Sequence, residues 1–155
     1  MSIGPLEAAR IEAARLLARG LSRHFALMGI SAVPEVILPS GRRADLMLLT
    51  RTGDIAIVEI KSSVEDFQTD RKWRDYLAYC DRFYFASHVG VAQEIFPPEA
   101  GFILCDAFGA EIIRESARTP LAGPTRKQLT IGLARIASAR LMALTDPEAR
   151  LDSGF

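Results

Sequence analysis

Three charged side chains interrupt two apolar, strand-like runs between residues 43 and 61. Asp45 lies on the first run, and Glu59 and Lys61 lie on the second. Because successive side chains on a strand alternate between its faces, Glu59 and Lys61, two positions apart, share one face. Carboxylates beside an ammonium group can hold a divalent cation and act on a phosphate group. The sequence therefore predicts that the chemistry of this chain takes place here.

The turn between the two runs decides whether the acids meet. A three-residue loop over residues 51–53, with its glycine in the left-handed conformation, sets Asp45 opposite Glu59. A two-residue loop of threonine and glycine sets Asp45 opposite Ile60 instead and separates the carboxylates. Gly53 stands at the third position of the longer loop, which favours the first alternative.

Opposed carboxylates need a positive charge nearby. Directly opposite side chains on paired strands lie about 5 Å apart, and like charges at that distance repel. Mg²⁺ or Mn²⁺ bridged by Asp45 and Glu59 would remove this repulsion, because such ions take hard oxygen ligands. Lys61 would then orient or deprotonate a water molecule, or stabilise charge on a phosphate. The alternative is a structural hairpin in which Lys61 neutralises both acids.

A known motif has the same arrangement. Asp45, followed after the hairpin by Glu59-Ile60-Lys61, resembles the motif of the PD-(D/E)XK, or restriction-endonuclease-like, nuclease superfamily, with Ala44 in place of the motif's proline. The chain is also similar over nearly its whole length to the MmcB-type DNA repair proteins of alphaproteobacteria. The stretches that carry this similarity are residues 41–45, 57–67, 70–73, 92–97 and 125–127.

The resemblance implies a metal-dependent nuclease that hydrolyses DNA phosphodiester bonds in DNA repair. In that role Asp45, Glu59 and Lys61 are the catalytic residues, and the backbone carbonyl of Ile60 is a third ligand of Mg²⁺ or Mn²⁺. The superfamily often adds a glutamate from its first helix, and Glu7 is the candidate here. A surface acid favoured by the dipole of the first helical turn is the other interpretation of Glu7.

Hydrophobic periodicity predicts the order of the elements. We expect helices at 5–28, 64–80 and 125–144, strands at 33–38, on both sides of the hairpin, and at 81–86, 101–107 and 110–114, and a helical turn at 91–96. This order predicts an α/β fold, a restriction-endonuclease-like mixed β-sheet flanked by α-helices. The predicted core stripes include Leu6 of the first helix, Trp73, Tyr76, Leu77 and Cys80 of the second, and Leu129, Gly132, Leu133, Ile136, Leu141 and Leu144 of the last.

Local basic clusters are the candidates for binding DNA, because the net charge of the whole chain is zero. Arg42 and Arg43 immediately precede the Asp45 strand, and Arg71, Lys72 and Arg74 lie on the helix after the motif. Arginine forks suit phosphate oxygens. Solvated surface charges are the alternative, and this alternative is favoured for the basic outer face of the last helix, which comprises Arg126, Lys127, Arg135 and Arg140.

Composition limits the remaining classes. A chain of 155 residues with 49% hydrophobic residues suits one domain, which we place at residues 1–147, followed by a flexible tail at 148–155. The two cysteines, Cys80 and Cys105, form no metal-binding spacing, so we expect buried thiols in a cytoplasmic protein. Neither an export signal nor a membrane span is expected.

Two functions remain open from the sequence. The first is the metal-dependent deoxyribonuclease, acting on DNA with other repair proteins as possible partners. The second is a catalytically silent, nuclease-like module that binds DNA or a repair partner, because a scaffold can keep its shape after it loses activity.

Overall fold

The computed structural model describes residues 2–149 and 154–155 of the chain, and these contain one six-stranded sheet with strand order β1-β2-β3-β4-β5-β6. Strands β1, β2 and β3 are antiparallel, β3, β4 and β5 are parallel, and β6 is antiparallel to β5. The predicted α/β fold with a mixed sheet flanked by helices is confirmed. In chain order the elements are α1 (Pro5–Leu27), β1 (Ser31–Ile37), β2 (Arg43–Leu49), β3 (Ile55–Ile60), α2 (Val64–Gln68), η1 (Trp73–Tyr79), β4 (Arg82–Ser87), η2 (Gln93–Ile95), β5 (Gly101–Cys105), β6 (Ala110–Arg114) and α3 (Gly123–Thr145).

The hairpin between β2 and β3 has the predicted three-residue loop. Gly53 has a φ of 91°, which is the left-handed conformation that glycine adopts without a steric penalty. The amide of Thr50 donates to the carbonyl of Asp54 at 3.0 Å, which closes the loop. The last paired residues toward the open end are Leu46 and Val58, so the next position sets Asp45 opposite Glu59.

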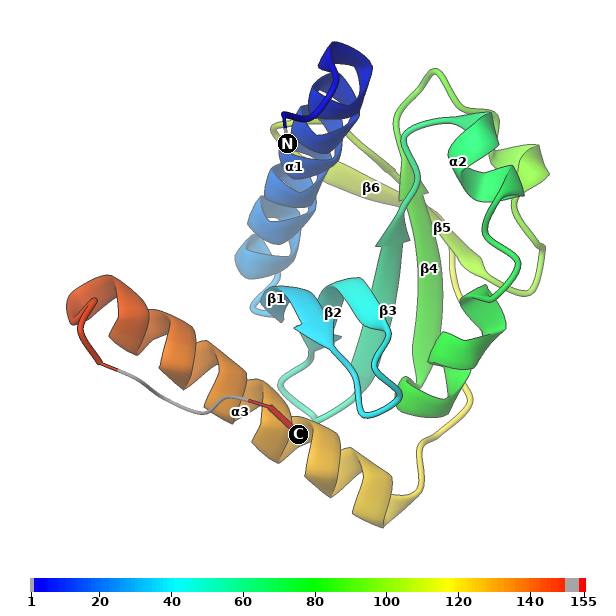
Figure 1. Cartoon of the computed structure of the whole chain (residues 1–155). Coiled ribbons are helices and arrows are strands. Elements are labelled where there is room, and N and C mark those ends of the chain that lie inside the picture. Colours follow the sequence, from blue (N-terminus) through cyan, green and yellow to red (C-terminus); the bar gives the residue numbers. More distant parts are fainter. Residues whose placement is uncertain (1, 150–153) are drawn as a thin grey trace.

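Helices cover both faces of the sheet (Figure 1). Helix α1 lies on one face, where Leu17, Leu21 and Phe25 pack into a cluster with apolar side chains of β2 to β5. The 3-10 helix η1 and helix α3 pack on the other face, over a second cluster rich in aromatic residues. Asp45 and Glu59 belong to the strand positions of this second face, because they alternate in step with Met47 and Ile57.

The prediction of one continuous helix over residues 64–80 is wrong. It begins as expected, because the Ser63 hydroxyl accepts from the amide of Asp66 at 3.1 Å. It then breaks at residues 69–72, where Asp70 accepts from the amide of Lys72 at 3.1 Å, and the chain resumes as the 3-10 helix η1. A 3-10 helix has three residues per turn. That period buries Trp73 and Tyr76 and leaves Leu77, predicted as core, 44% exposed.

The two long helices extend past the sheet, so parts of their predicted core stripes are exposed. Leu6 of α1 is 83% exposed, and the buried positions of this helix begin only at Leu17. In α3 the buried positions end at Ile136, and Leu141 and Leu144 are 63% and 82% exposed. The apolar period is helical in both cases, but the sheet underneath is shorter than the helices.

Two arginines of α3 contact the sheet region and are not free on an outer face. The Arg126 guanidinium lies against the Asp81 carboxylate, with 2.6 Å between Nη2 and Oδ1. Arg140 donates to the backbone carbonyls of Pro34 and Glu35 on the edge strand β1, the latter at 2.7 Å. The expectation of a solvated basic face is therefore wrong for these two residues.

Three other expectations concern the chain end, the cysteines and the membrane. Cys80 and Cys105 are buried free thiols, as predicted. Half of the predicted tail, residues 150–153, lies outside the described residues, and the Phe155 ring packs against Gly132 of α3. Within the described part of the chain, no helix is both long and apolar enough to cross a membrane.

Gly20 allows α1 to approach the β5–β6 turn closely. A Cβ atom at position 20 would lie 1.7 Å from the carbonyl oxygen of Asp106. We expect Gly20→Ala to lower the free energy of unfolding by about 1–3 kcal/mol, because the backbone must move to admit the methyl group. Urea unfolding followed by circular dichroism measures this change. Gly123→Ala is the control, since nothing lies within 4 Å of a Cβ there, and equal effects of both changes would contradict the prediction.

Candidate active site

Asp45 and Glu59 meet where the β2–β3 ladder ends, and their side chains replace the next backbone hydrogen bonds. The amide of Asp45 donates to Oε1 of Glu59 at 3.1 Å, and the amide of Ile60 donates to Oδ2 of Asp45 at 2.8 Å. Each carboxylate thus keeps a second oxygen to which no described residue donates. No buried side-chain oxygen among the described residues lacks a partner, so these two oxygens reach solvent.

The surroundings of this pair disfavour two negative charges. Burial raises the pKa of Asp45 above its ordinary range, although the Ile60 amide and Lys61 oppose the shift. Burial, with the neighbouring Asp45 carboxylate as second cause, raises the pKa of Glu59 to about 8. Two acids that share a site cannot both ionise easily unless a positive charge compensates them. The pair is therefore short of positive charge.

Lys61 extends from the end of β3 toward a different acid. Its side chain is 10% exposed, and its Nζ lies 3.0 Å from Oδ2 of Asp70. Burial, the largest influence, would lower the pKa of Lys61, but the hydrogen bond and charge of Asp70, with Asp66 and Glu59, raise it overall. Lys61 is therefore a fixed ammonium group. The alternative in which it neutralises Asp45 and Glu59 directly does not describe this geometry.

Asp70 is the site residue that the sequence did not indicate. It lies in the break between α2 and η1, a break that the helical pattern did not predict. Its contact with Lys61 joins residues nine positions apart that lie on either side of α2, and no short-range spacing rule identifies such a pair. Only the position of the broken helix over the sheet brings Asp70 to the lysine.

The backbone of Ile60 also faces the site. Its amide points toward Asp45 on β2. The N–H and C=O groups of one strand residue point to the same neighbouring strand, so the Ile60 carbonyl faces the same side. The amide of Lys61 instead donates to Ala86 of β4 at 2.9 Å, as this alternation requires. The carbonyl of Ile60 is thus on the edge of β3 that faces Asp45.

The donor set suits a hard divalent cation. Two carboxylates with solvent-facing oxygens and one backbone carbonyl are the ligands that Mg²⁺ uses, with water and substrate phosphate in the other positions. Glu7 is not brought to this pair: it lies exposed in the first turn of α1. In the described residues no three acidic, histidine or cysteine side chains come close enough to share an ion.

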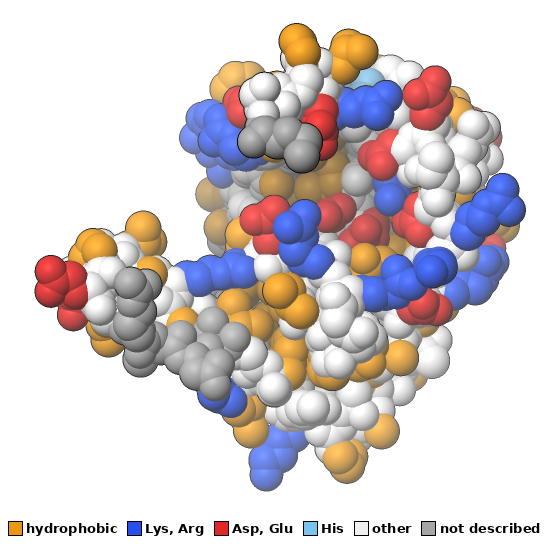
Figure 2. Space-filling model, viewed as in Figure 1, with side chains coloured by type: hydrophobic (Ala, Val, Ile, Leu, Met, Phe, Trp, Pro, Cys, Tyr) orange, Lys and Arg blue, Asp and Glu red, His pale blue; other side chains and the backbone are white. Residues whose placement is uncertain are grey.

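Of the five basic residues predicted to contact phosphate, three lie within ion-pair distance of an acid in the described part of the chain and two do not. Arg42 pairs with Asp75 at 3.0 Å, and Arg43 lies 3.7 Å from Glu35. Arg74 pairs with Glu99 at 2.7 Å and stacks over Trp73, whose ring is buried and not a base-stacking surface. Arg71 and Lys72 are exposed and form no ion pair with any described residue. In Figure 2 acidic side chains surround a hollow between α1 and the α2 segment, and basic side chains lie along its rim.

Fold and site together define an open α/β domain whose central hairpin carries two opposed acids and a lysine at its end. The chain belongs to the MmcB-like family: the family model described as DNA repair protein MmcB-like matches residues 5–148. A solved protein of unknown function from Silicibacter pomeroyi is 38% identical, with a TM-score of 0.86 and 97% of this chain and 98% of that chain covered. No curated protein matches.

Proposed function

We propose that this member of the DNA repair family is a metal-dependent nuclease that hydrolyses DNA phosphodiester bonds. The observation that supports it is the geometry of one strand end: Asp45 opposite Glu59, with Lys61 one strand step further. The family description supports DNA as the substrate class. The resemblance to the PD-(D/E)XK motif supports the reaction type.

Each group in the site has a separate task in this proposal. Asp45 and Glu59, with the Ile60 carbonyl, would hold Mg²⁺ or Mn²⁺. The bound ion would supply Lewis-acid polarisation of a phosphoryl oxygen and a nucleophile at neutral pH. Lys61 stays protonated against Asp70, so it would stabilise negative charge on the phosphate and would not act as the base. Asp70 would keep the Lys61 ammonium group in position.

The surface around the site would supply the binding energy for DNA. Arg71 and Lys72 are free to contact phosphates, and Arg42 and Arg43 lie at the start of β2, the strand that carries Asp45. A protein with zero net charge gains little from long-range attraction to DNA. We therefore expect weak binding of DNA alone, with a dependence on salt concentration that corresponds to a few phosphate contacts.

The test is cleavage of labelled single-stranded, duplex and branched DNA in Mn²⁺, Mg²⁺ and a chelator. We expect cleavage only with metal, and a loss of at least about a hundredfold in Asp45→Asn and Lys61→Met, because each removes a group acting in the transition state. Lys127→Met is the matched control, since Lys127 is exposed on α3 far along the chain. Cleavage that survives both site changes would refute the assignment.

The catalytically silent DNA-binding module is the second candidate. The observation that favours it is the Lys61–Asp70 ion pair, which engages the ammonium group of the lysine within the protein. This candidate predicts metal-independent DNA binding without cleavage of any substrate. Thermal unfolding with Mn²⁺ separates the two, because an ion that binds the folded state raises the melting temperature. The nuclease proposal requires that Mn²⁺ raise the melting temperature and that Asp45→Asn remove this rise. The binding-module proposal requires no such rise.

A further inference from the structure

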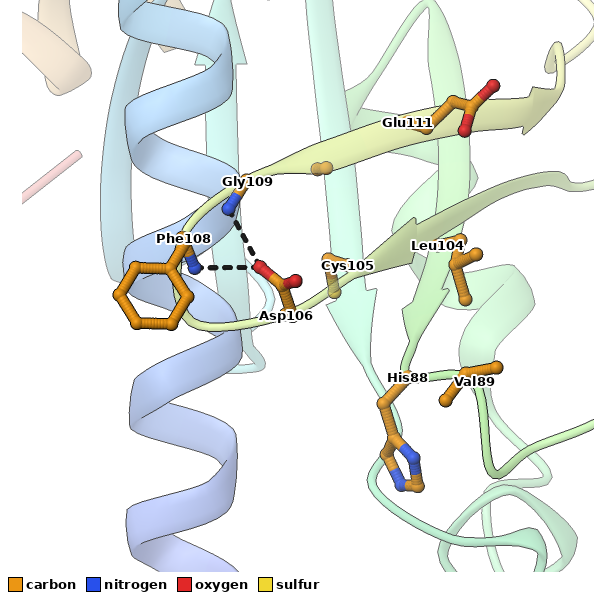
Figure 3. Close-up of a pocket in the computed structure, with 9 residues that line it drawn as sticks. His88, Val89, Leu104, Cys105, Asp106, Phe108, Gly109 and Glu111 are labelled. Atoms are coloured by element: carbon orange, nitrogen blue, oxygen red, sulfur yellow. Dashed lines mark hydrogen bonds between the residues drawn. The ribbon is translucent and has the colours of Figure 1, made fainter.

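A second hollow lies at the carboxyl ends of β4 and β5, beside the end of β3 that carries the proposed nuclease site, and none of its lining residues belongs to that site. It has a volume of about 510 Å³ and is formed by the loop after β4, the end of β5, the β5–β6 turn and the start of β6. Figure 3 shows the residues that line it. Val89 and Phe108 are 89% and 74% exposed there. Exposed apolar side chains beside a hollow offer a partner protein area to bury.

The aromatic side chain is presented by a rigid turn. Oδ1 of Asp106 accepts from the amides of Phe108 and Gly109 at 2.8 and 2.9 Å (Figure 3). The amide of Asp106 donates to the carbonyl of Gly109 at 3.0 Å, and Gly20 of α1 packs against the carbonyl of Asp106. Because the backbone that carries Phe108 is held in place, binding at its side chain costs less conformational entropy than on a loose loop, so this residue can act as an anchor.

The charges around the hollow are of one sign. Asp106 and Glu111 contribute carboxylates, and none of the lining residues is lysine or arginine. Hydrogen bonds from the turn amides lower the pKa of Asp106, so it is ionised. The His88 ring contacts the amide of Gly90 through Nδ1 and the carbonyl of Ser62 through Nε2. The rim therefore repels phosphate and attracts cations.

The adjoining strand β6 offers backbone groups as well. Among the described residues, nothing hydrogen-bonds to the backbone of β6 except its neighbour β5. The opposite edge strand, β1, differs: Pro34 lacks a donor, and Arg140 occupies the carbonyls of Pro34 and Glu35. An extended peptide could pair with the open edge of β6. The regular pairing of β6 with β5 is interrupted by a β-bulge, where the register shifts between Phe102 and Ile103.

We propose that the hollow and the β6 edge bind an extended segment of a partner protein in which an apolar side chain is flanked by lysine or arginine. The apolar side chain packs against Phe108, and the basic residues pair with Asp106 and Glu111. A second copy of this chain fits less well, because a symmetric contact brings the same acids face to face. Recruitment by such a partner would compensate for the weak DNA binding of a neutral chain.

The test is selection from a phage-displayed library of random dodecapeptides, without metal or DNA, followed by amide NMR mapping with a synthesised enriched peptide. We expect enrichment of apolar residues flanked by lysine or arginine, and shifts at the amides of residues 88–89 and 104–111. Phe108→Ala should weaken binding about tenfold or more, as for an anchor residue. Glu111→Lys should reduce affinity for the basic peptide and raise it for the same peptide with glutamates. Leu144→Ala, 82% exposed on α3, is the matched control and should change nothing.

Several results would overturn the proposal. They are enrichment that is equal in the Phe108→Ala protein, enriched peptides without positive charge, and shifts confined to other surfaces. A DNA oligonucleotide that shifts the same amides would assign the hollow to nucleic acid. A concentration-dependent dimer abolished by Phe108→Ala would assign it to a second copy. Melting temperatures of the variants show that each remains folded, and none of these outcomes depends on nuclease activity.

Discussion

Replacing Asp81 with alanine is expected to lower the free energy of unfolding by about 3–5 kcal/mol, the range for breaking a buried ion pair by removing one partner. The Asp81 side chain is fully buried, and its two oxygens accept from Arg126 at 2.6 and 2.7 Å. They also accept from the amides of Ile55 at 2.7 Å and Leu121 at 2.8 Å. The change would leave the amides of Ile55 and Leu121 without their acceptor, and the Arg126 guanidinium would keep only the Gly53 carbonyl at 2.8 Å and the more distant Asp54 carboxylate at 3.8 Å.

The charge of Asp81 follows from the same contacts. Burial alone would raise its pKa, but the hydrogen bonds from Arg126, Ile55 and Leu121 outweigh burial and hold the pKa at about 2. Because this value lies below that of the unfolded chain, the stabilisation is complete above about pH 4 and is lost as pH falls toward 2. Acidification should therefore break the Asp81–Arg126 ion pair only as the pH approaches 2.

Urea unfolding of Asp81→Ala measures the loss, with Glu94→Ala as the control for removal of an exposed acid. The double change Asp81→Ala/Arg126→Met isolates the pair, because removing both partners avoids an uncompensated buried charge. We expect the double variant to lose less free energy of unfolding than the two single variants lose together. Strictly additive losses would show that the two residues act independently and would contradict the ion-pair account.

Stability without metal is expected to fall as pH rises from about 4.5 to 8. The folded-state pKa of Glu59, about 8, lies above its ordinary value of 4.5, so the folded protein keeps a proton that the unfolded chain releases. The proton on Glu59 therefore stabilises the folded protein fully below pH 4.5. This stabilisation decreases between pH 4.5 and 8, and the free energy of unfolding levels off above pH 8. Between pH 4.5 and 8 the free energy of unfolding should fall by an amount on the order of 3–5 kcal/mol.

A divalent cation is expected to reverse this trend, since it competes with the proton for the same oxygens. The rise in melting temperature with Mn²⁺ should be small at pH 5.5 and large at pH 8.5. Thermal unfolding across this range, with and without Mn²⁺, measures both effects. Glu59→Gln should flatten the metal-free profile and remove the Mn²⁺ response, whereas Glu94→Gln should leave both unchanged. An unaltered profile in Glu59→Gln would show that other groups cause the dependence.

The hairpin was predictable from the sequence because local features determine it. Gly53 at the third loop position selects the loop, the loop sets the register, and the alternation of strand side chains then sets Asp45 opposite Glu59. Each step involves residues close in sequence. The order of helices and strands follows from hydrophobic period in the same way.

What the sequence did not indicate depends on contacts between distant elements. The break at residues 69–72 overrides a continuous helical pattern and brings Asp70 to Lys61. The exposure of Leu141 and Leu144 depends on where the sheet ends, which the amphipathic period of α3 does not report. Arg126 has the sequence context of a surface residue, and only the position of α3 against Asp81 makes it an internal partner.

The ion pair between Asp81 and Arg126 also constrains the order of events during synthesis. A ribosome delivers the amino-terminal part of a chain first, at about 5–20 residues per second. The aspartate at the start of β4 emerges well before Arg126, the residue that compensates its charge. A nascent chain that ends before α3 would have to bury this carboxylate without its counter-ion. The sheet should therefore consolidate only after the last helix has left the exit tunnel.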